Sequence, residues 1–155
     1  MLKQLRDIFN KTLINPDRDD AQSRDHALRL ATATLLIEVV RADYEVDVKE
    51  IEATVRQLRT HFDLTEDETL LLVKEAEEKA DHSVSLQDFT RVLHEQLTEA
   101  EKHLVIEMLW RVALADDRLD KHEDHVVRKV AGLLYVTHSD LIRIRNTVKA
   151  ARAVK

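Results

Sequence analysis

The chain has 155 residues, of which 44% are hydrophobic, and this is enough for one domain with a buried core. It contains one glycine and one proline, which leaves little material for tight turns with positive φ or for flexible linkers. This scarcity predicts an all-α fold. The absence of cysteine excludes disulfides, thiolate zinc sites and cysteine nucleophiles. A formal net charge of −6 disfavours nucleic-acid binding, because contact with phosphates requires a basic surface.

The N-terminal stretch predicts a short amphipathic helix. Residues 2–14 carry apolar side chains at three- and four-residue spacing, and the helix is expected to end near Pro16. Lys3 and Arg6 interrupt it early, so it lacks the long apolar core of a signal peptide or a membrane span. We therefore expect a cytoplasmic protein that is not an integral membrane protein.

Two central helices are predicted at residues 25–42 and 98–115, because apolar side chains nearly surround both segments. Amphipathic segments follow each of them, and a further helix at residues 85–97 joins the two groups. Together with the N-terminal helix this gives about eight helices. Three of the helix starts have the spacing of a threonine cap and an acid three residues later. These pairs are Thr65 with Glu68, Thr98 with Glu101, and Thr137 with Asp140.

An acidic nine-residue segment occurs twice, each time between two predicted helices. The first corner (residues 42–50) and the second corner (residues 115–123) both read Ala-Asp, three residues, Asp, two residues, Glu. A shift of 73 positions relates them, and after a one-residue deletion a shift of 72 matches Leu58 with Val130. The chain therefore predicts an internal duplication, with two three-helix halves related by a pseudo-two-fold axis.

We accordingly expect residues 1–155 to form a single domain. The expected subdivisions are 1–20 for the N-terminal docking helix and loop, 25–80 for the first repeat, 85–97 for the connecting helix and 98–150 for the second repeat.

The two corners together supply six carboxylates: Asp43, Asp47, Glu50, Asp116, Asp120 and Glu123. Hard cations bind several oxygens that converge at about 2.0–2.6 Å, so corners that face each other would form a site for calcium, magnesium, manganese or zinc. The alternative is helix capping, with the second aspartate of each corner at the N-cap and the glutamate at N3. Capping does not account for Asp43 and Asp116, because an acid at a helix C-terminus opposes the helix dipole.

At these corners the chain resembles the TerB-like family, the tellurite-resistance group of small helical proteins whose halves carry repeated Ala-Asp-Gly-x-x-Asp-x-x-Glu corners. The similarity covers roughly residues 25–145, including 35–39 before the first corner and 133–137 after the second. The family's glycine is replaced by Tyr44 in the first corner and by Asp117 in the second. The resemblance implies an all-α domain with a metal-binding acidic surface and a role in stress response, alongside membrane and other partner proteins. It implies no catalytic activity.

Two functions therefore remain open. The first is a non-enzymatic scaffold, associated with stress or tellurite resistance, that binds a divalent cation through the corners; the second is a pure protein-interaction domain whose corners only cap helices. His122 and His125 stand beside the second corner and are potential zinc ligands, but the chain has neither His-Glu-x-x-His nor Glu-x-x-His, which favours surface histidines. No glycine-framed serine or phosphate-binding loop is present in the sequence, and we expect no enzyme.

Two further sets of charged residues have more than one possible role. Glu38 and Arg111 occupy equivalent positions of the central helices, so they either pair near the pseudo-two-fold axis or lie on an exposed strip. Near the C-terminus, Arg145, Lys149 and Arg152 fall along one helix face. This basic face either complements a helix dipole or docks onto an acidic partner, an anionic membrane surface or a second copy. Protein partners, homo-oligomers and a peripheral location at the inner face of the membrane are therefore among our expectations.

Overall fold

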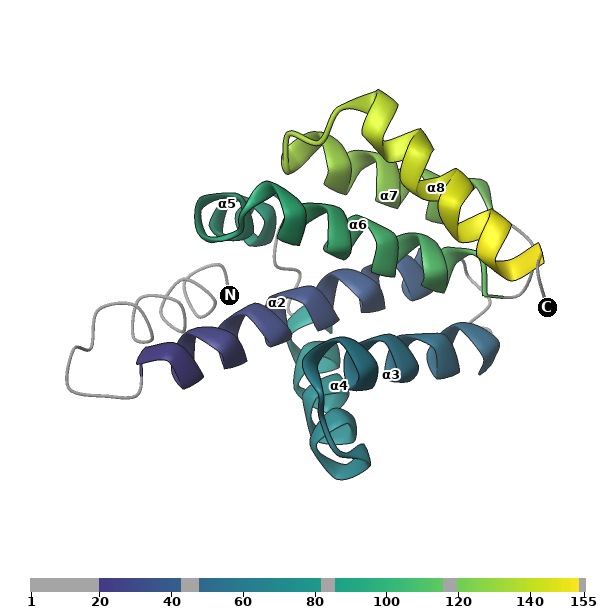
Figure 1. The fold of residues 1–155 in the computed structure, drawn as a ribbon. Coiled ribbons are helices and arrows are strands. Elements are labelled where there is room, and N and C mark those ends of the chain that lie inside the picture. The colour runs from purple at the N-terminus through teal and green to yellow at the C-terminus, as the bar shows by residue number, and fades with distance from the viewer. Residues whose placement is uncertain (1–19, 43–47, 82–85, 116–119, 154–155) are drawn as a thin grey trace.

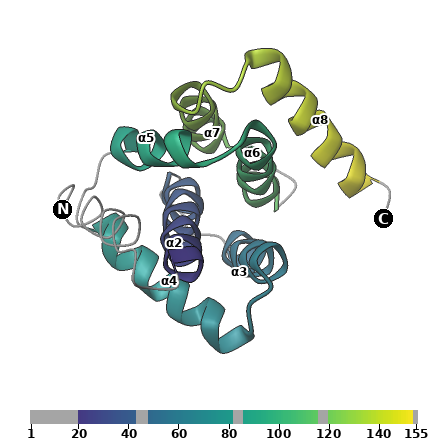
Figure 2. The same ribbon diagram turned by 60° about the vertical axis from the view of Figure 1, so that its left-hand side comes forward.

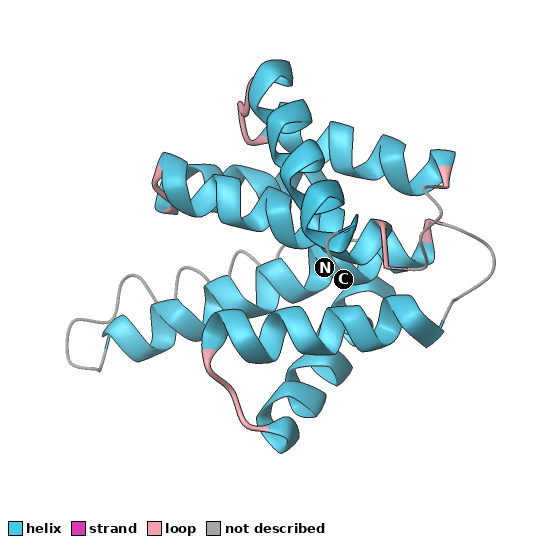
Figure 3. Ribbon diagram, turned by 45° about the vertical axis from the view of Figure 1, so that its right-hand side comes forward, coloured by secondary structure: helices cyan, strands magenta, loops and turns pink. Residues whose placement is uncertain are grey.

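The computed structural model describes residues 20–42, 48–81, 86–115 and 120–153. In these ranges the chain forms helices and short loops, with no strand (Figure 3). The helix predicted at residues 2–14 lies outside the described residues. The described residues form seven helices, which are α2 (Asp20–Arg41), α3 (Val48–Phe62), α4 (Glu66–Asp81), α5 (Leu86–Gln96), α6 (Glu99–Ala113), α7 (Lys121–Leu133) and α8 (His138–Ala153). The all-α prediction is confirmed.

The core is organised around α2 and α6, which pack against each other. Both helices are apolar on nearly every side, and side chains such as Leu35 and Leu109 are fully buried. Helix α2 packs against α3 and α4, and α6 packs in the same way against α7 and α8. In addition, α3 crosses to contact α6 and α7 crosses to contact α2. Figure 2 looks along α2 and α6 and shows α4 and α8 on opposite sides of this central pair. The two halves predicted from the sequence are therefore present.

The same C-terminal cap ends α3 and α7. The backbone N–H of Leu64 donates to the Arg59 carbonyl oxygen at 3.0 Å, and that of Val136 donates to the Ala131 carbonyl oxygen at 2.9 Å. Such a bond between residues five apart is the signature of a Schellman motif. The residue before each donor has the left-handed conformation, with φ of 53° at Asp63 and 60° at Tyr135. The caps are related by the shift of 72, so the one-residue deletion precedes them.

Three predicted threonine caps are present. Glu68 and Glu101 each accept a hydrogen bond from the backbone N–H of a threonine three residues earlier, at 2.9 and 2.8 Å. In return, the hydroxyl oxygens of Thr65 and Thr98 accept from the backbone N–H groups of these glutamates, which completes two capping boxes. At the start of α8, the Thr137 hydroxyl oxygen accepts from the Asp140 N–H at 3.1 Å.

Trp110 fixes α6 against α8. Its side chain is fully buried, and the indole Nε1–H donates to the carbonyl oxygen of Leu141 at 3.2 Å. A buried indole combines a large apolar surface with a donor that needs a partner, so one residue provides both packing and a directional link between two helices. The residue at the equivalent position in α2 is Ile37.

We predict that Trp110→Phe destabilises the domain by about 1–2 kcal/mol, because it removes the hydrogen bond and part of the packing. Trp110→Ala should cost about 3–5 kcal/mol, as expected for a truncated core aromatic residue. Urea denaturation followed by circular dichroism measures both values. Leu104→Ala, an exposed position on the same helix, is the control and should change stability by less than about 0.5 kcal/mol. Equal stability of Trp110→Phe and this control would contradict the prediction.

Candidate cation site at the acidic corners

The described residues that flank the two corners lie at the same end of the bundle. Figure 1 shows that α2 and α6 end, and α3 and α7 begin, at the end that also carries the C-terminus. Of the six predicted ligands, Glu50, Asp120 and Glu123 belong to the described residues. Asp43, Asp47 and Asp116 lie outside the described residues. The described candidate ligands therefore all lie at the starts of α3 and α7.

Asp120 caps α7, as the capping hypothesis predicts. It has the extended backbone conformation of an N-cap residue, with φ of −70° and ψ of 139°. Its Oδ1 atom accepts from the backbone N–H of His122 at 2.7 Å and from that of Glu123 at 3.4 Å. Both bonds go to Oδ1, so capping occupies one of the two oxygens of this carboxylate.

Glu123 differs from an ordinary N3 acid in being buried. Its side chain is 1% exposed, whereas Glu101 at the N3 position of α6 is exposed. Glu101 accepts from the backbone N–H of its N-cap residue. In contrast, Glu123 Oε2 is buried and has no hydrogen-bond partner among the residues that the structure describes. Removing a carboxylate oxygen from water without a partner is costly, so its position calls for a compensating charge.

Glu50 occupies the same position in the first half. It lies in the first turn of α3, is also 1% exposed, and stands 73 residues before Glu123. The Thr54 hydroxyl donates to the Glu50 backbone carbonyl oxygen at 2.8 Å. The duplicated fold thus buries one glutamate at the start of each crossing helix, a feature that the spacing of the acids did not reveal.

The described residues do not complete a metal site by themselves. Within the ranges given above, no group of three or more histidine, aspartate or glutamate side chains has the arrangement of a metal site. His122 and His125 are both exposed, as expected for surface histidines.

The ion pair predicted between Glu38 and Arg111 is not formed. Arg111 Nε donates instead to Glu107 Oε2 at 3.2 Å, one turn earlier on α6. A partner four residues away on the same helix is already within reach, whereas pairing across the bundle would require both side chains to enter the core. Burial raises the pKa of Glu38, and the positive charge of Arg41 opposes this shift.

Part of the basic C-terminal face has a structural role. Arg152 Nη2 donates to the carbonyl oxygen of Ala115 at 3.1 Å, just beyond the end of α6. A cation at this point complements the negative end of the helix dipole, which was one of the two roles predicted for this face. Arg143 pairs with Asp140 at 3.2 Å, and this hydrogen bond is the main cause of the lowered pKa of Asp140.

A buried lysine was not predicted from the sequence. Lys102 in α6 is 3% exposed, and its Nζ lies 2.6 Å from Nδ1 of His94 in α5. The ring of His94 also contacts the ring of Tyr135, with centroids 4.5 Å apart. Because the chain folds back between α5 and α6, this contact is not visible in the helical periodicity. The cluster lies near the start of α6, about 20 Å along the helix from the second corner, and so belongs to the opposite end of the bundle.

The fold and corners define a class: a duplicated all-α bundle in which an acidic segment follows each central helix. The model of the family described as tellurite resistance protein TerB matches residues 29–146, and the chain belongs to this family. The resemblance noted in the sequence is thereby confirmed. No curated protein and no solved structure matches the chain. None of the described helices is both long enough and apolar enough to cross a membrane.

The raised pKa of Glu38 leads to a prediction about stability. Its folded pKa lies above the ordinary value of 4.5, so its contribution to stability is present below that value and is lost as the pH rises through the folded pKa. Glu38→Gln removes the ionisation and should raise the melting temperature by about 1–2 °C at neutral pH, with the gain shrinking towards zero below about pH 4.

Thermal unfolding of Glu38→Gln and of the wild type, measured at neutral pH and below about pH 4, tests this prediction. Glu52→Gln, at an exposed position of α3, is the matched control and should leave the melting temperature nearly unchanged. A lower melting temperature for Glu38→Gln at neutral pH would show that attraction to Arg41 outweighs the cost of burial.

Proposed function

We propose that this TerB domain is a non-enzymatic scaffold that binds a divalent cation through its acidic corners. The observation that carries the proposal is Glu123, whose Oε2 is buried and lacks a hydrogen-bond partner among the described residues. A cation bound to this oxygen would offset the cost of removing it from water.

The available donors suit a hard cation. Capping uses Oδ1 of Asp120, which leaves Oδ2 for a metal ion. Glu50 offers a carboxylate at the equivalent place in the first half. Asp43, Asp47 and Asp116 complete the proposed ligand set from the corners. Carboxylate oxygens favour calcium, magnesium or manganese, whereas zinc prefers nitrogen and sulfur ligands.

The scaffold part of the proposal concerns protein partners. Large apolar side chains are exposed on three different helices, including Val48, Leu71 and Leu104. Together with membership of a tellurite-resistance family, this supports a role in assembling other proteins under stress. Under this proposal the domain works in the cytoplasm, either free or at the inner face of the membrane.

The second candidate is a protein-interaction domain without a metal site. It is favoured by the observed cap of α7, because Asp120 already fulfils a structural role. It also agrees with the absence of a three-ligand group among the residues that the structure describes. The two candidates differ in one measurable property, the affinity for a divalent cation.

Calorimetric titration of the chelator-stripped protein with calcium, magnesium, manganese and zinc separates them. We expect micromolar binding of at least one ion, abolished by Glu123→Gln, because the amide retains the size of the side chain but loses its charge. At 100 times the Kd, the ion should stabilise the protein by about 2.7 kcal/mol, which raises the melting temperature by roughly 5–10 °C.

Glu101→Gln is the matched control. It changes an N3 glutamate that is exposed and already accepts a hydrogen bond from the backbone N–H of Thr98. This variant should bind the ion like the wild type. Circular dichroism of the ion-free Glu123→Gln protein verifies that it folds. Absence of binding heat and thermal shift for every ion would favour the protein-interaction domain. Unchanged binding by folded Glu123→Gln would contradict the role of Glu123 as a ligand.

A further inference from the structure

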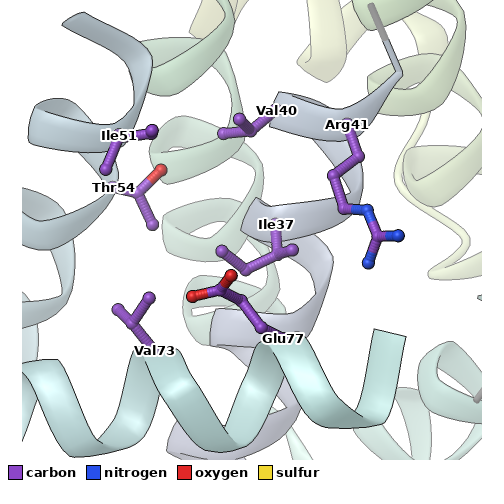
Figure 4. A pocket seen from close by; sticks show the side chains of 7 residues that line it. All are labelled: Ile37, Val40, Arg41, Ile51, Thr54, Val73 and Glu77. Carbon is purple, nitrogen blue, oxygen red and sulfur yellow. The ribbon is translucent and has the colours of Figure 1, made fainter. Parts of the chain in front are cut away.

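A pocket of about 310 Å³ opens between α2, α3 and α4. Figure 4 shows side chains from all three helices around it, with Ile37 and Val40 from α2, Ile51 from α3 and Val73 from α4 forming apolar walls. This volume is at the lower end of the range of ligand-binding pockets. The pocket belongs to the first half of the duplicated fold and was not apparent from the sequence.

The second half shows which group fits such a position. The residue equivalent to Ile37 is Trp110, whose indole is fully buried between α6 and α8. Ile37 is a much smaller side chain, and the pocket lies beside it. The internal duplication thus provides a comparison within one molecule. One half supplies its own indole at this position, and the other half leaves an open apolar space.

The apolar surface continues outside the pocket along α3. Val48 is 66% exposed and Ile51 is 42% exposed. The equivalent positions in α7 are Lys121 and Asp124, and Asp124 forms an ion pair with Arg128 at 2.7 Å. The first half therefore exposes apolar side chains where the second half has charged ones. Because this surface extends beyond the mouth of the pocket, a segment of protein would cover it better than a small molecule.

One carboxylate enters the pocket. Glu77 extends from α4 towards Ile37 and Val73 in Figure 4. It has no hydrogen bond or ion pair among the residues that the structure describes. Its equivalent in the second half is Lys149. An unpaired carboxylate beside apolar walls complements a positive charge on the ligand. Arg41, in the last turn of α2, also lines the pocket.

We propose that this pocket is a docking site for a partner protein, which inserts an indole-sized aromatic side chain into it and places a basic residue next to Glu77. The aromatic ring would take the position that Trp110 occupies in the second half, and the rest of the partner segment would cover Val48 and Ile51. An aromatic anchor with a basic neighbour is a frequent composition of binding hot spots. Such a protein is the kind of partner that the proposed scaffold takes, and its docking does not depend on the cation site.

Selection from a random peptide library on the 155-residue chain tests the proposal. We expect enriched peptides to contain an aromatic residue with lysine or arginine three or four positions away, the spacing of neighbours on a helix face. Binding of an enriched peptide should shift the methyl NMR signals of Ile37, Ile51 and Val73. Failure to enrich aromatic residues, or shifts confined to other methyl groups, would overturn the proposal.

Variants that copy residues of the second half sharpen the test. Ile37→Trp should fill the pocket and weaken peptide binding at least about tenfold, equivalent to about 1.4 kcal/mol. Glu77→Lys changes an exposed residue, is expected to fold normally, and should weaken binding severalfold. Leu71→Trp adds an indole at an exposed position of α4 outside the pocket lining and is the matched control, with unchanged affinity. Unchanged binding by Glu77→Lys and by folded Ile37→Trp would overturn the proposal.

Two further measurements test whether the pocket binds something other than a partner protein. If tryptamine binds the pocket as tightly as the peptide, the natural ligand is a small aromatic amine. If sedimentation shows a dimer that Ile37→Trp dissociates, the occupant is a second copy of the chain. Both results would overturn docking of a partner protein. Calcium titration of Ile37→Trp keeps the two proposals separate, because loss of peptide binding with retained cation binding affects only the pocket.

Discussion

The packing of α2 against α6 is the constraint on which the rest of the structure depends. A helix that is apolar on nearly every side is stable in water only if neighbours cover all of it. In each half, two following helices cover the central helix, and α3 and α7 then cross to contact the central helix of the other half. A single half would leave the apolar face of its central helix open to solvent. The duplication is therefore a requirement of burial.

Most of the fold could be predicted because its signals are local. Helical periodicity identified the central helices, and the threonine-to-acid spacing located capping boxes such as Thr65 with Glu68. The cross-bundle pairing of Glu38 with Arg111 was wrong, because Glu107 on the same helix is the nearer partner. The candidate site was predictable only in part. The spacing of acids in the corners indicated residue positions but not burial, since N3 glutamates are exposed in α4 and α6 and buried in α3 and α7.

The two halves share a backbone plan but differ in surface chemistry. In the second half, Trp110 fills the space between α6 and α8, and Arg152 binds the carbonyl oxygen of Ala115 beyond the end of α6. In the first half, Ile37 leaves a pocket, and the crossing helix exposes Ile51 where the second half has Asp124. A pocket of this kind depends on side-chain volumes from three helices at once, which explains why periodicity did not reveal it. The internal repeat becomes informative once equivalent positions are compared in three dimensions.

Helix α3 connects the two proposals physically. Its first turn carries Glu50, and the next residue, Ile51, forms a wall of the pocket. The Thr54 hydroxyl lies on the same stretch and donates to the Glu50 carbonyl oxygen at 2.8 Å, so the acid and the pocket wall belong to the same turns of one helix. A cation bound at Glu50 would restrict the start of α3, and a side chain in the pocket would restrict the same turns. Any coupling between the two events must be reciprocal, because each ligand changes the affinity for the other by the same factor. Under the two proposals, the first half would link cation binding to partner recruitment, whereas the second half carries Trp110 at the position equivalent to Ile37.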